Sequence, residues 1–232
     1  MSFALPDAAG PLRRERLRTA RLYFVCDARP RGEDPEALLL AALNGGIDIV
    51  QLREKALDRR TIERSGATFR RLADTYSALF TVNDDPALAS SCGADGVHLG
   101  QDDTPVAEAR AALGPDAIIG LSTHSEEQIA KASEAAGAER PDYISVGPVW
   151  ETPTKEGRPA VGLGLIEHAA AYASLPFYAI GGIDASNAAQ VVEAGAERLC
   201  VVRAIRDAAD PGAAAAELRR AFAAIGEAAP GA

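Results

Sequence analysis

Three polar side chains alternate in the segment Gln51-Leu-Arg-Glu-Lys55, which directly follows an apolar run. If extended geometry continues there, Gln51, Arg53 and Lys55 project on one side, because alternate residues of a strand share a face. Arg53 offers a planar fork of donors and Lys55 a compact charge, a combination that suits a phosphate or pyrophosphate. The alternative for this segment is surface ion pairing with Glu54 and Asp58.

Two sets of carboxylates also follow apolar runs. Asp84 comes just after residues 79–82, and the pair Asp102-Asp103 comes just after residues 96–99. Neighbouring strands lie about 4.8 Å apart, so Asp84 and one carboxylate of the pair would repel unless one is protonated or a cation bridges them. Mg²⁺ takes one or two carboxylates and shares substrate phosphate oxygens, so it fits this pattern. The alternative is helix capping, since Asp85-Pro86 and Asp103-Thr104-Pro105 both look like helix starts.

The end of the chain carries a third candidate site. Gly181-Gly182 and Val202-Arg203 each follow an apolar run. Glycines let an anion approach backbone N–H groups, and a helix that begins near Arg203 would add partial positive charge. The pattern therefore predicts a phosphate site, with a simple tight turn as the alternative. Of the histidines, His98 is expected inside a strand, His168 on a helix, and His124 where it could contact substrate or act as an acid or base.

Eight short apolar runs would position these groups. They span residues 22–25, 47–52, 79–82, 96–99, 118–121, 143–146, 177–180 and 199–202. Helical stretches such as 35–43, 126–136 and 187–194 alternate with them, which indicates βαβ units and a parallel sheet covered on both faces. Eight strands favour a single-domain α/β fold, a closed (β/α)8 TIM barrel, over an open doubly wound sheet, and no Gly-x-Gly-x-x-Gly follows the first run. In such a barrel the polar groups after the strands converge on one rim.

Composition excludes several classes of function. Lys and Arg number 24 against 33 Asp and Glu, a net charge of −9, which argues against binding nucleic acid or an anionic membrane but allows a small phosphorylated substrate. The isolated residues Cys26, Cys92 and Cys200 predict buried, reduced thiols in a cytoplasmic protein. No apolar run is long enough to span a bilayer. We expect one barrel domain at 21–225, a loosely packed N-terminal extension at 1–20 and a frayed tail at 226–232. The sequence leaves the oligomeric state, including a homo-oligomer, open.

Taken together, several motifs resemble the thiamine-phosphate synthase family. They are Val50-Gln-Leu-Arg-Glu-Lys55, Val82-Asn-Asp84, Gly96-Val-His-Leu-Gly-Gln101 with Asp103, Gly120-Leu-Ser122, Gly147-Pro148 with Thr152-Pro-Thr-Lys155, and Ile180-Gly-Gly-Ile183. The resemblance covers about residues 22–205. It implies a transferase that joins the pyrophosphate ester of hydroxymethylpyrimidine to hydroxyethylthiazole phosphate, giving thiamine phosphate and pyrophosphate with the help of Mg²⁺.

The resemblance also implies roles for individual residues. Asp84 and Asp103 would bind Mg²⁺. The pyrimidine pyrophosphate would contact Gln51, Leu52, Arg53, Glu54, Lys55, Asn83, Ser122 and Lys155. The thiazole phosphate would contact Thr152, Pro153, Thr154, Gly182, Val202 and Arg203. Within the pyrimidine set the catalytic residues would be Arg53, Lys55, Ser122 and Lys155, and the loop 147–164 would close over the substrates. One departure is Arg203, where the family has Ser; the change is tolerable if the contact runs through backbone N–H, and it weakens thiazole phosphate binding if the hydroxyl is needed.

The residue chemistry agrees with a dissociative substitution. Pyrophosphate leaves once its charge is neutralised, an aminopyrimidine stabilises the methylene cation left behind, and the thiazole nitrogen needs no base. The rivals are a thiazole tautomerase on the same barrel, for which His124 would be the key residue, a non-catalytic paralogue, and a phosphate-binding barrel enzyme of another pathway. Mg²⁺-dependent binding of pyrophosphate distinguishes the synthase from the first two.

Overall fold

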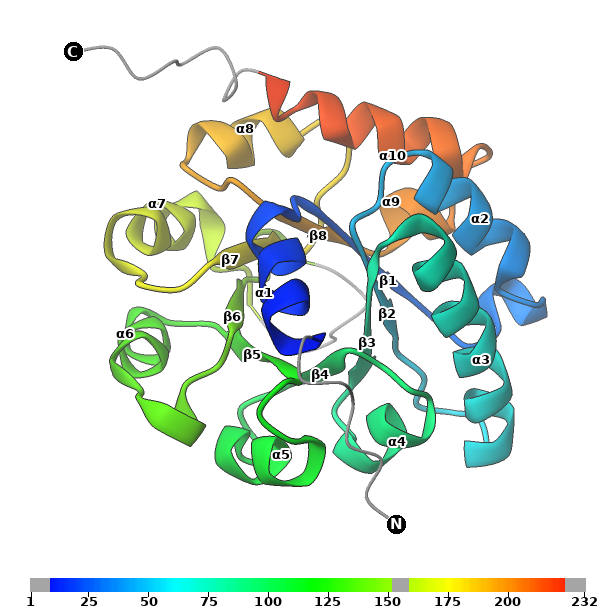
Figure 1. Ribbon diagram of the computed structural model, residues 1–232. Helices are drawn as coiled ribbons and strands as arrows, with labels where there is room; N and C mark the ends of the chain where they lie inside the picture. The colour runs from blue at the N-terminus through cyan, green and yellow to red at the C-terminus, as the bar shows by residue number, and fades with distance from the viewer. Residues whose placement is uncertain (1–8, 152–158, 224–232) are drawn as a thin grey trace.

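Eight parallel strands close into one barrel, with helices arranged around it (Figure 1). The computed structural model describes residues 9–151 and 159–223. The strands pair in chain order, with β8 closing on β1, and are β1 (Leu22–Cys26), β2 (Ile49–Leu52), β3 (Leu79–Asn83), β4 (Gly96–Leu99), β5 (Ile118–Thr123), β6 (Tyr143–Val146), β7 (Phe177–Ile180) and β8 (Leu199–Val201). Each apolar run of the sequence forms one strand, and the predicted single-domain (β/α)8 barrel is confirmed.

The helices follow the strands in alternation. They are α1 (Ala9–Thr19), α2 (Glu36–Asn44), α3 (Arg59–Tyr76), α4 (Pro86–Ser91), α5 (Val106–Leu113), α6 (Glu126–Glu134), α7 (Gly162–Tyr172), α8 (Ala188–Glu193), α9 (Arg203–Arg206) and α10 (Pro211–Arg220), with short 3-10 turns at Pro30–Gly32 and Gly137–Glu139. Across residues 9–151 and 159–223, none of the helices combines the length and the apolar character that crossing a membrane requires.

Several helices begin at a side chain that caps their first turn. The side chains of Asp85, Ser125 and Asp210 each accept a backbone N–H in the first turn of the helix that follows, which satisfies a donor that the helix itself leaves unpaired. Thr104 was expected to do the same for α5. The helix begins at Val106 with Pro105 at its cap position and no side-chain cap, because the extended backbone of Pro105 sets Thr104 one residue too far out.

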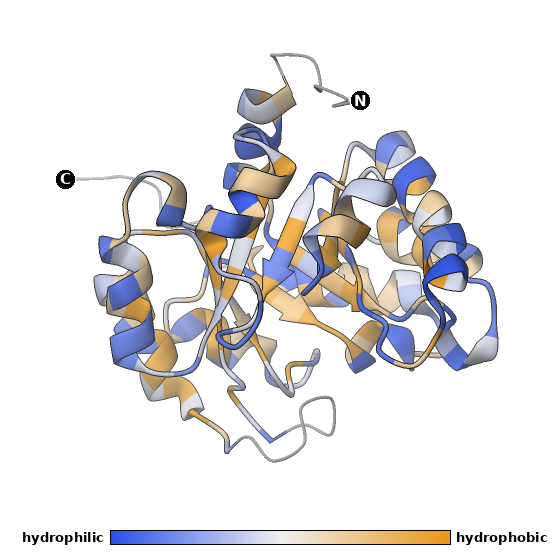
Figure 2. Ribbon diagram, turned by 90° about the horizontal axis from the view of Figure 1, so that it is seen from below, coloured by the Kyte–Doolittle hydropathy of each residue, from blue (hydrophilic) through white to orange (hydrophobic). Residues whose placement is uncertain are grey.

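The barrel separates two apolar clusters. The larger lies between the strands and the surrounding helices, and the smaller fills the barrel interior; apolar colour accordingly concentrates on the strands in Figure 2. Inside, the rings of Tyr23, Tyr143 and Tyr178 pack with centroids 5.3–6.0 Å apart. Gly120 makes room for them, because a Cβ there would lie 2.2 Å from the Tyr143 ring. Cys26, Cys92 and Cys200 are buried and take part in no disulfide, as predicted.

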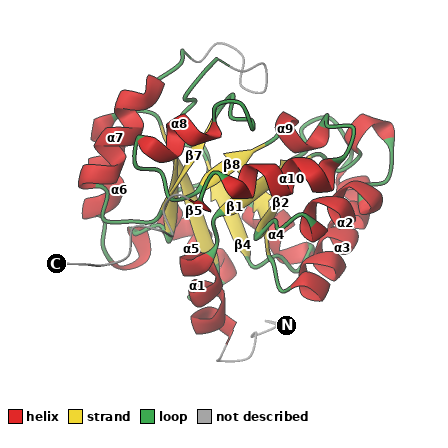
Figure 3. Ribbon diagram, turned by 90° about the horizontal axis from the view of Figure 1, so that it is seen from above, coloured by secondary structure: helices red, strands yellow, loops and turns green. Residues whose placement is uncertain are grey.

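Helix α1 covers the amino end of the barrel (Figures 1 and 3). Leu17 is 3% exposed and belongs to the interior cluster. The buried Arg13 donates from Nε to Asp95 Oδ1 at 2.8 Å. Within the expected extension 1–20, residues 9–19 therefore form a helix that packs on the barrel, because the floor of the barrel supplies an apolar surface that Leu17 covers. The expected tail at 226–232 lies outside the described residues.

Three aspartates stand directly before alternate strands at this amino end. Asp48, Asp95 and Asp142 precede β2, β4 and β6, and each side chain accepts a backbone N–H at the start of the preceding strand at 2.9 Å. Each carboxylate also pairs with arginine: Asp48 with Arg219, Asp95 with Arg13 and Arg70, and Asp142 with Arg14 and Arg110. The amino end is thus a network of internally satisfied charges that ties helices to strands.

Candidate active site

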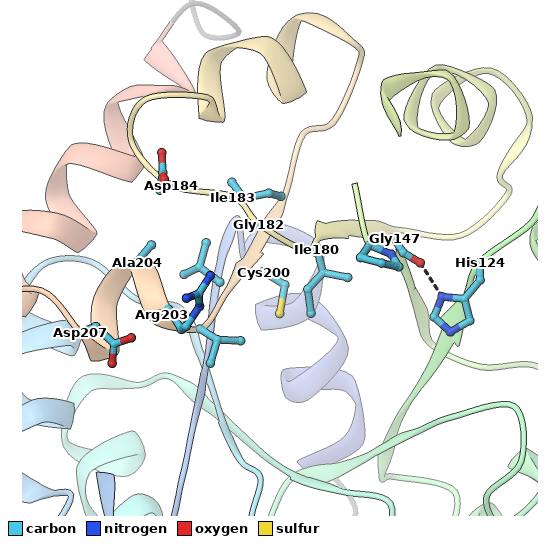
Figure 4. A pocket seen from close by; sticks show the side chains of 14 residues that line it. His124, Gly147, Ile180, Gly182, Ile183, Asp184, Cys200, Arg203, Ala204 and Asp207 are labelled. Atoms are coloured by element: carbon cyan, nitrogen blue, oxygen red, sulfur yellow. Dashed lines mark hydrogen bonds between the residues drawn. The ribbon is translucent and has the colours of Figure 1, made fainter. Parts of the chain in front are cut away.

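A cavity of about 340 Å³ opens at the carboxyl ends of the strands (Figure 4). Its walls come from the segments that follow β5 to β8, and the structure brings Gly182, Val202 and Arg203 together in it. Gly181 and Gly182 have φ of 107° and 68°, a backbone conformation that glycine adopts at little cost. A Cβ on Gly182 would lie 2.9 Å from Cβ of Trp150, so the turn has no room for a side chain. The result is an open, glycine-lined wall that faces the first residue of α9.

A second, smaller cavity of about 40 Å³ lies over the barrel interior. Gln51, Arg53 and Asn83, which end β2 and β3, line it together with interior residues such as His98 and Ser145. The two cavities share Ile180, Cys200 and Val202 as lining residues. They are therefore neighbours, and a ligand in one would lie against a ligand in the other.

The remaining residues of the predicted pyrimidine set are placed differently. Leu52 is 1% exposed and packs in the outer core, so its side chain faces away from both cavities. Ser122 is buried inside the barrel, where its Oγ lies 3.0 Å from His98 Nε2, rather than standing on the open rim. Glu54 accepts the backbone N–H of Lys55 and shapes the loop. Asp58 caps α3 instead of joining the surface ion pairs considered for this segment.

Asp84 and Asp103 meet at the ends of β3 and β4. Burial of the Asp84 carboxyl and its contact with the Asp103 carboxyl raise the pKa of Asp84, and Lys55, with Nζ 3.3 Å from Asp84 Oδ2, opposes that rise. Asp103 Oδ2 also accepts the N–H of Gly100 at 2.7 Å. The neighbour Asp85 caps α4, so capping and pairing fall to different residues.

The backbone at Asp84 is strained. Its φ is +64°, a region that residues other than glycine seldom occupy and that is concentrated at functional sites. Its N–H donates to the carbonyl of His98 at 2.8 Å, which holds the turn against β4. Two carboxyls that are forced together in this way, beside a cavity with basic residues, form a donor set that fits Mg²⁺. Within the described ranges, no group of three or more acidic, Cys or His side chains could hold a metal.

His124 lies in the larger cavity, at the opposite end from Arg203 (Figure 4). Its Nδ1 contacts the carbonyl oxygen of Gly147. A carbonyl only accepts, so Nδ1 carries the hydrogen and donates it. This bond ties the end of β5 to the turn after β6, which gives His124 a structural task in the cavity wall.

Thr152, Pro153, Thr154 and Lys155, with the middle of the expected closing loop 147–164, lie outside the described residues. No functional role was predicted for Tyr23 or Tyr143, although both belong to a polar chain inside the barrel. The available signal was the recurrence of polar side chains within apolar runs, as at Thr81, His98 and Ser145.

Comparison with known proteins identifies the family of this chain. The family model described as thiamine monophosphate synthase matches residues 22–205. A thiamine-phosphate synthase of Thermobifida fusca is 50% identical over 208 residues, covering 89% of this chain and 94% of that protein. One from Streptomyces avermitilis is 47% identical over 217 residues, covering 93% and 98%. The structure of a thiamine phosphate pyrophosphorylase from Pyrococcus furiosus is similar with a TM-score of 0.79 and 32% identity, covering 91% of this chain and 98% of that one. This chain belongs to the thiamine monophosphate synthase family.

Proposed function

We propose that this protein is a thiamine-phosphate synthase, which joins hydroxymethylpyrimidine pyrophosphate to hydroxyethylthiazole phosphate and releases pyrophosphate. The observation that carries the proposal is the pair of adjoining cavities. One is lined by Gln51, Arg53 and Asn83, and the other by Gly182, Val202 and Arg203. Two substrates seated in cavities that share a wall have their reacting atoms brought together, which is the largest requirement of a bimolecular substitution.

The pyrimidine substrate is the electrophile. The bond between its methylene carbon and the pyrophosphate oxygen breaks, and the electron pair leaves on that oxygen. Arg53 and Lys55 offset the charge that develops there. Mg²⁺ held by Asp84 and Asp103 would supply further neutralisation of the pyrophosphate. By resemblance Lys155 and Ser122 join this set; the buried Ser122 hydroxyl would act from the barrel interior.

The thiazole substrate is the nucleophile. Its ring nitrogen already has a lone pair, which forms the new C–N bond without transfer of a proton to the protein. The reaction therefore requires that the protein orient the two substrates and neutralise the charge of the pyrophosphate, and it needs no general base. The glycine-lined turn and the start of α9 favour the phosphate through backbone N–H groups. Arg203 adds a cation where the family has Ser. In this chain the thiazole phosphate would therefore be held through backbone N–H groups and not through a side-chain hydroxyl. Thr152, Pro153 and Thr154 would complete this subsite by resemblance.

The test is release of pyrophosphate by the purified protein. We expect release only when both precursors and Mg²⁺ are present, with thiamine phosphate formed in equal amount. Each precursor alone, and both precursors with a chelator, serve as controls. Isomerisation of the thiazole without metal, and no pyrophosphate release, would contradict the proposal and would make the tautomerase the better assignment, with His124 as the residue to substitute.

A further inference from the structure

A junction of hydrogen bonds lies inside the barrel, directly beneath the smaller cavity. The hydroxyl of Tyr23 accepts from Gln51 Nε2 at 2.8 Å. The same hydroxyl lies 2.7 Å from Thr81 Oγ1 and 3.0 Å from the hydroxyl of Tyr143. Tyr23 is 1% exposed, and burial raises the pKa of its phenol, so the hydroxyl stays neutral. One buried oxygen thus meets three side chains from three different strands.

The chain of contacts continues across the barrel. The Tyr143 hydroxyl lies 3.1 Å from His98 Nδ1, and His98 Nε2 lies 3.0 Å from Ser122 Oγ. Residues on opposite sides of the barrel are therefore linked through side chains that are almost wholly buried. Buried polar groups in a satisfied network hold their partners in one orientation, because any rotation would leave a donor or acceptor unpaired.

Gln51, Tyr23 and His98 of this network all line the smaller cavity. The Gln51 side chain lies beside Arg53 and Asn83 there and is 3% exposed. An amide has two chemically different ends, an NH2 that donates and an oxygen that accepts. Because Tyr23 takes a hydrogen from the NH2 end, the carbonyl oxygen is on the other side of the group. A ligand that approaches Gln51 from the cavity would therefore meet an acceptor.

We propose that Tyr23 is a positioning residue, which fixes the amide of Gln51 so that the site favours a pyrimidine with an amino group over one with an oxo group at the same ring position. The inference rests on the proposed function, since it requires that the pyrimidine occupies the cavity lined by Gln51. An amino group donates to the carbonyl oxygen of Gln51. An oxo group would face it with a second acceptor, which leaves both groups without a hydrogen and disfavours binding.

A second tyrosine provides a matched control. Tyr178 belongs to the same interior cluster as Tyr23 and packs edge-on against its ring, with centroids 5.3 Å apart. Its hydroxyl donates to the carbonyl oxygen of Ala20 at 3.2 Å, near the amino end of the barrel. Both tyrosines are fully buried, so replacing either by phenylalanine removes one buried hydroxyl. Only the change at Tyr23 releases Gln51.

The experiment compares the affinities of two pyrimidines. The monophosphate ester of the amino hydroxymethylpyrimidine and that of its oxo counterpart are titrated by calorimetry, with Mg²⁺ present, into the wild-type protein, Tyr23→Phe and Tyr178→Phe. We expect the wild type to prefer the amino compound, Tyr23→Phe to lose roughly tenfold or more of that preference, the scale of one oriented hydrogen bond, and Tyr178→Phe to keep it. A preference that is unchanged in folded Tyr23→Phe overturns the inference.

Gln51→Leu keeps the experiment decisive if Tyr23→Phe does not fold. Leucine retains much of the bulk and lacks both ends of the amide, so the ratio of the two affinities should fall close to one. A Gln51→Leu protein that still prefers the amino compound would show that Gln51 does not recognise the amino group. A wild type that binds neither compound contradicts the proposed function itself, whereas a wild type that binds both equally contradicts only the role of Tyr23.

Discussion

Aspartates stand at both ends of the barrel, and the two ends treat them in opposite ways. At the amino end, Asp48, Asp95 and Asp142 each accept a strand N–H and pair with at least one arginine. At the carboxyl end, Asp84 and Asp103 face one another, and the cation that pairs with Asp84 is the exposed Lys55. Aspartates are therefore paired with arginine at the amino end, whereas at the carboxyl end two carboxyls meet and Asp84 pairs with one exposed lysine.

The difference shows how the barrel divides stability from ligand binding. Buried charges contribute to a stable fold only when their partners are built in, and the amino end supplies those partners from α1, α3, α5 and α10. The carboxyl end holds Asp84 with a positive φ beside another carboxyl, an arrangement that the rest of the fold must offset. Barrel enzymes have their active sites at the carboxyl ends of the strands. In this protein the facing carboxyls lie at that end, and the aspartates paired with arginine lie at the amino end.

The largest effect on activity is expected for Asp84→Asn, which tests the difference between the two ends of the barrel. Asparagine tolerates the positive φ and removes the repulsion with Asp103, so we expect the temperature of thermal unfolding to stay the same or rise slightly. The catalytic efficiency kcat/KM for thiamine phosphate formation should fall by at least roughly a thousandfold, because the charge that holds Mg²⁺ is lost. Steady-state kinetics with calorimetric unfolding measure both quantities.

Asp85→Asn is the matched control for this change. Asp85 is the next residue and caps α4, and asparagine caps helices about as well. We expect nearly normal kcat/KM. Equal losses in the two variants would mean that the turn, and not the Asp84 carboxylate, matters.

The second prediction concerns the amino end. Asp95→Ala leaves the buried Arg13 and the N–H of Phe80 without their acceptor, which should lower the free energy of unfolding by about 3 kcal/mol. The kcat of the folded fraction should not change, because the substitution is at the other end of the barrel. Urea unfolding followed by circular dichroism, and kinetics well below the unfolding transition, separate the two effects. A variant of normal stability with reduced kcat would contradict the division of roles.

The third prediction is a pH dependence of metal binding. The pKa of Asp84 is raised, so its proton is held more tightly than that of an ordinary aspartate, and Mg²⁺ must compete with it. As the pH falls through this raised pKa, the Mg²⁺ concentration for half-maximal activity should rise by up to about tenfold per pH unit. Above that pKa it should be flat. Titration of Mg²⁺ at a series of pH values measures it, and a concentration that falls with decreasing pH would contradict the assignment.

Local features of the fold were predictable from the sequence. The eight apolar runs became the eight strands, because a strand covered on both faces needs a continuous apolar stretch. Asp85 caps a helix as the sequence Asp85-Pro86 indicated, since capping involves residues only two or three positions apart. The candidate residues directly follow apolar runs in the sequence, so their place at the strand ends, and therefore on one rim, was also predictable.

Contacts between residues far apart in the chain could not be predicted from local sequence patterns. Strand alternation places Gln51 and Leu52 on opposite faces, but barrel closure decides that Gln51 is the one inside and Leu52 the one outside. The burial of Ser122 against His98, and the packing of α1 over the barrel floor, depend on surfaces that exist only after the strands have closed. The site roles of the individual residues, including those at 152–155, stay predictions.

By itself, the sequence determined the alternation of strands and helices, the number of strands, and the groups available at each strand end. Those are consequences of hydrophobic periodicity and of capping, which act over a few residues. Only the tertiary structure decided which aspartates are neutralised and which confront each other, that two cavities share a wall, and that Tyr23 meets Gln51. These depend on barrel closure, which brings together side chains far apart in the chain and excludes the water that would otherwise satisfy them.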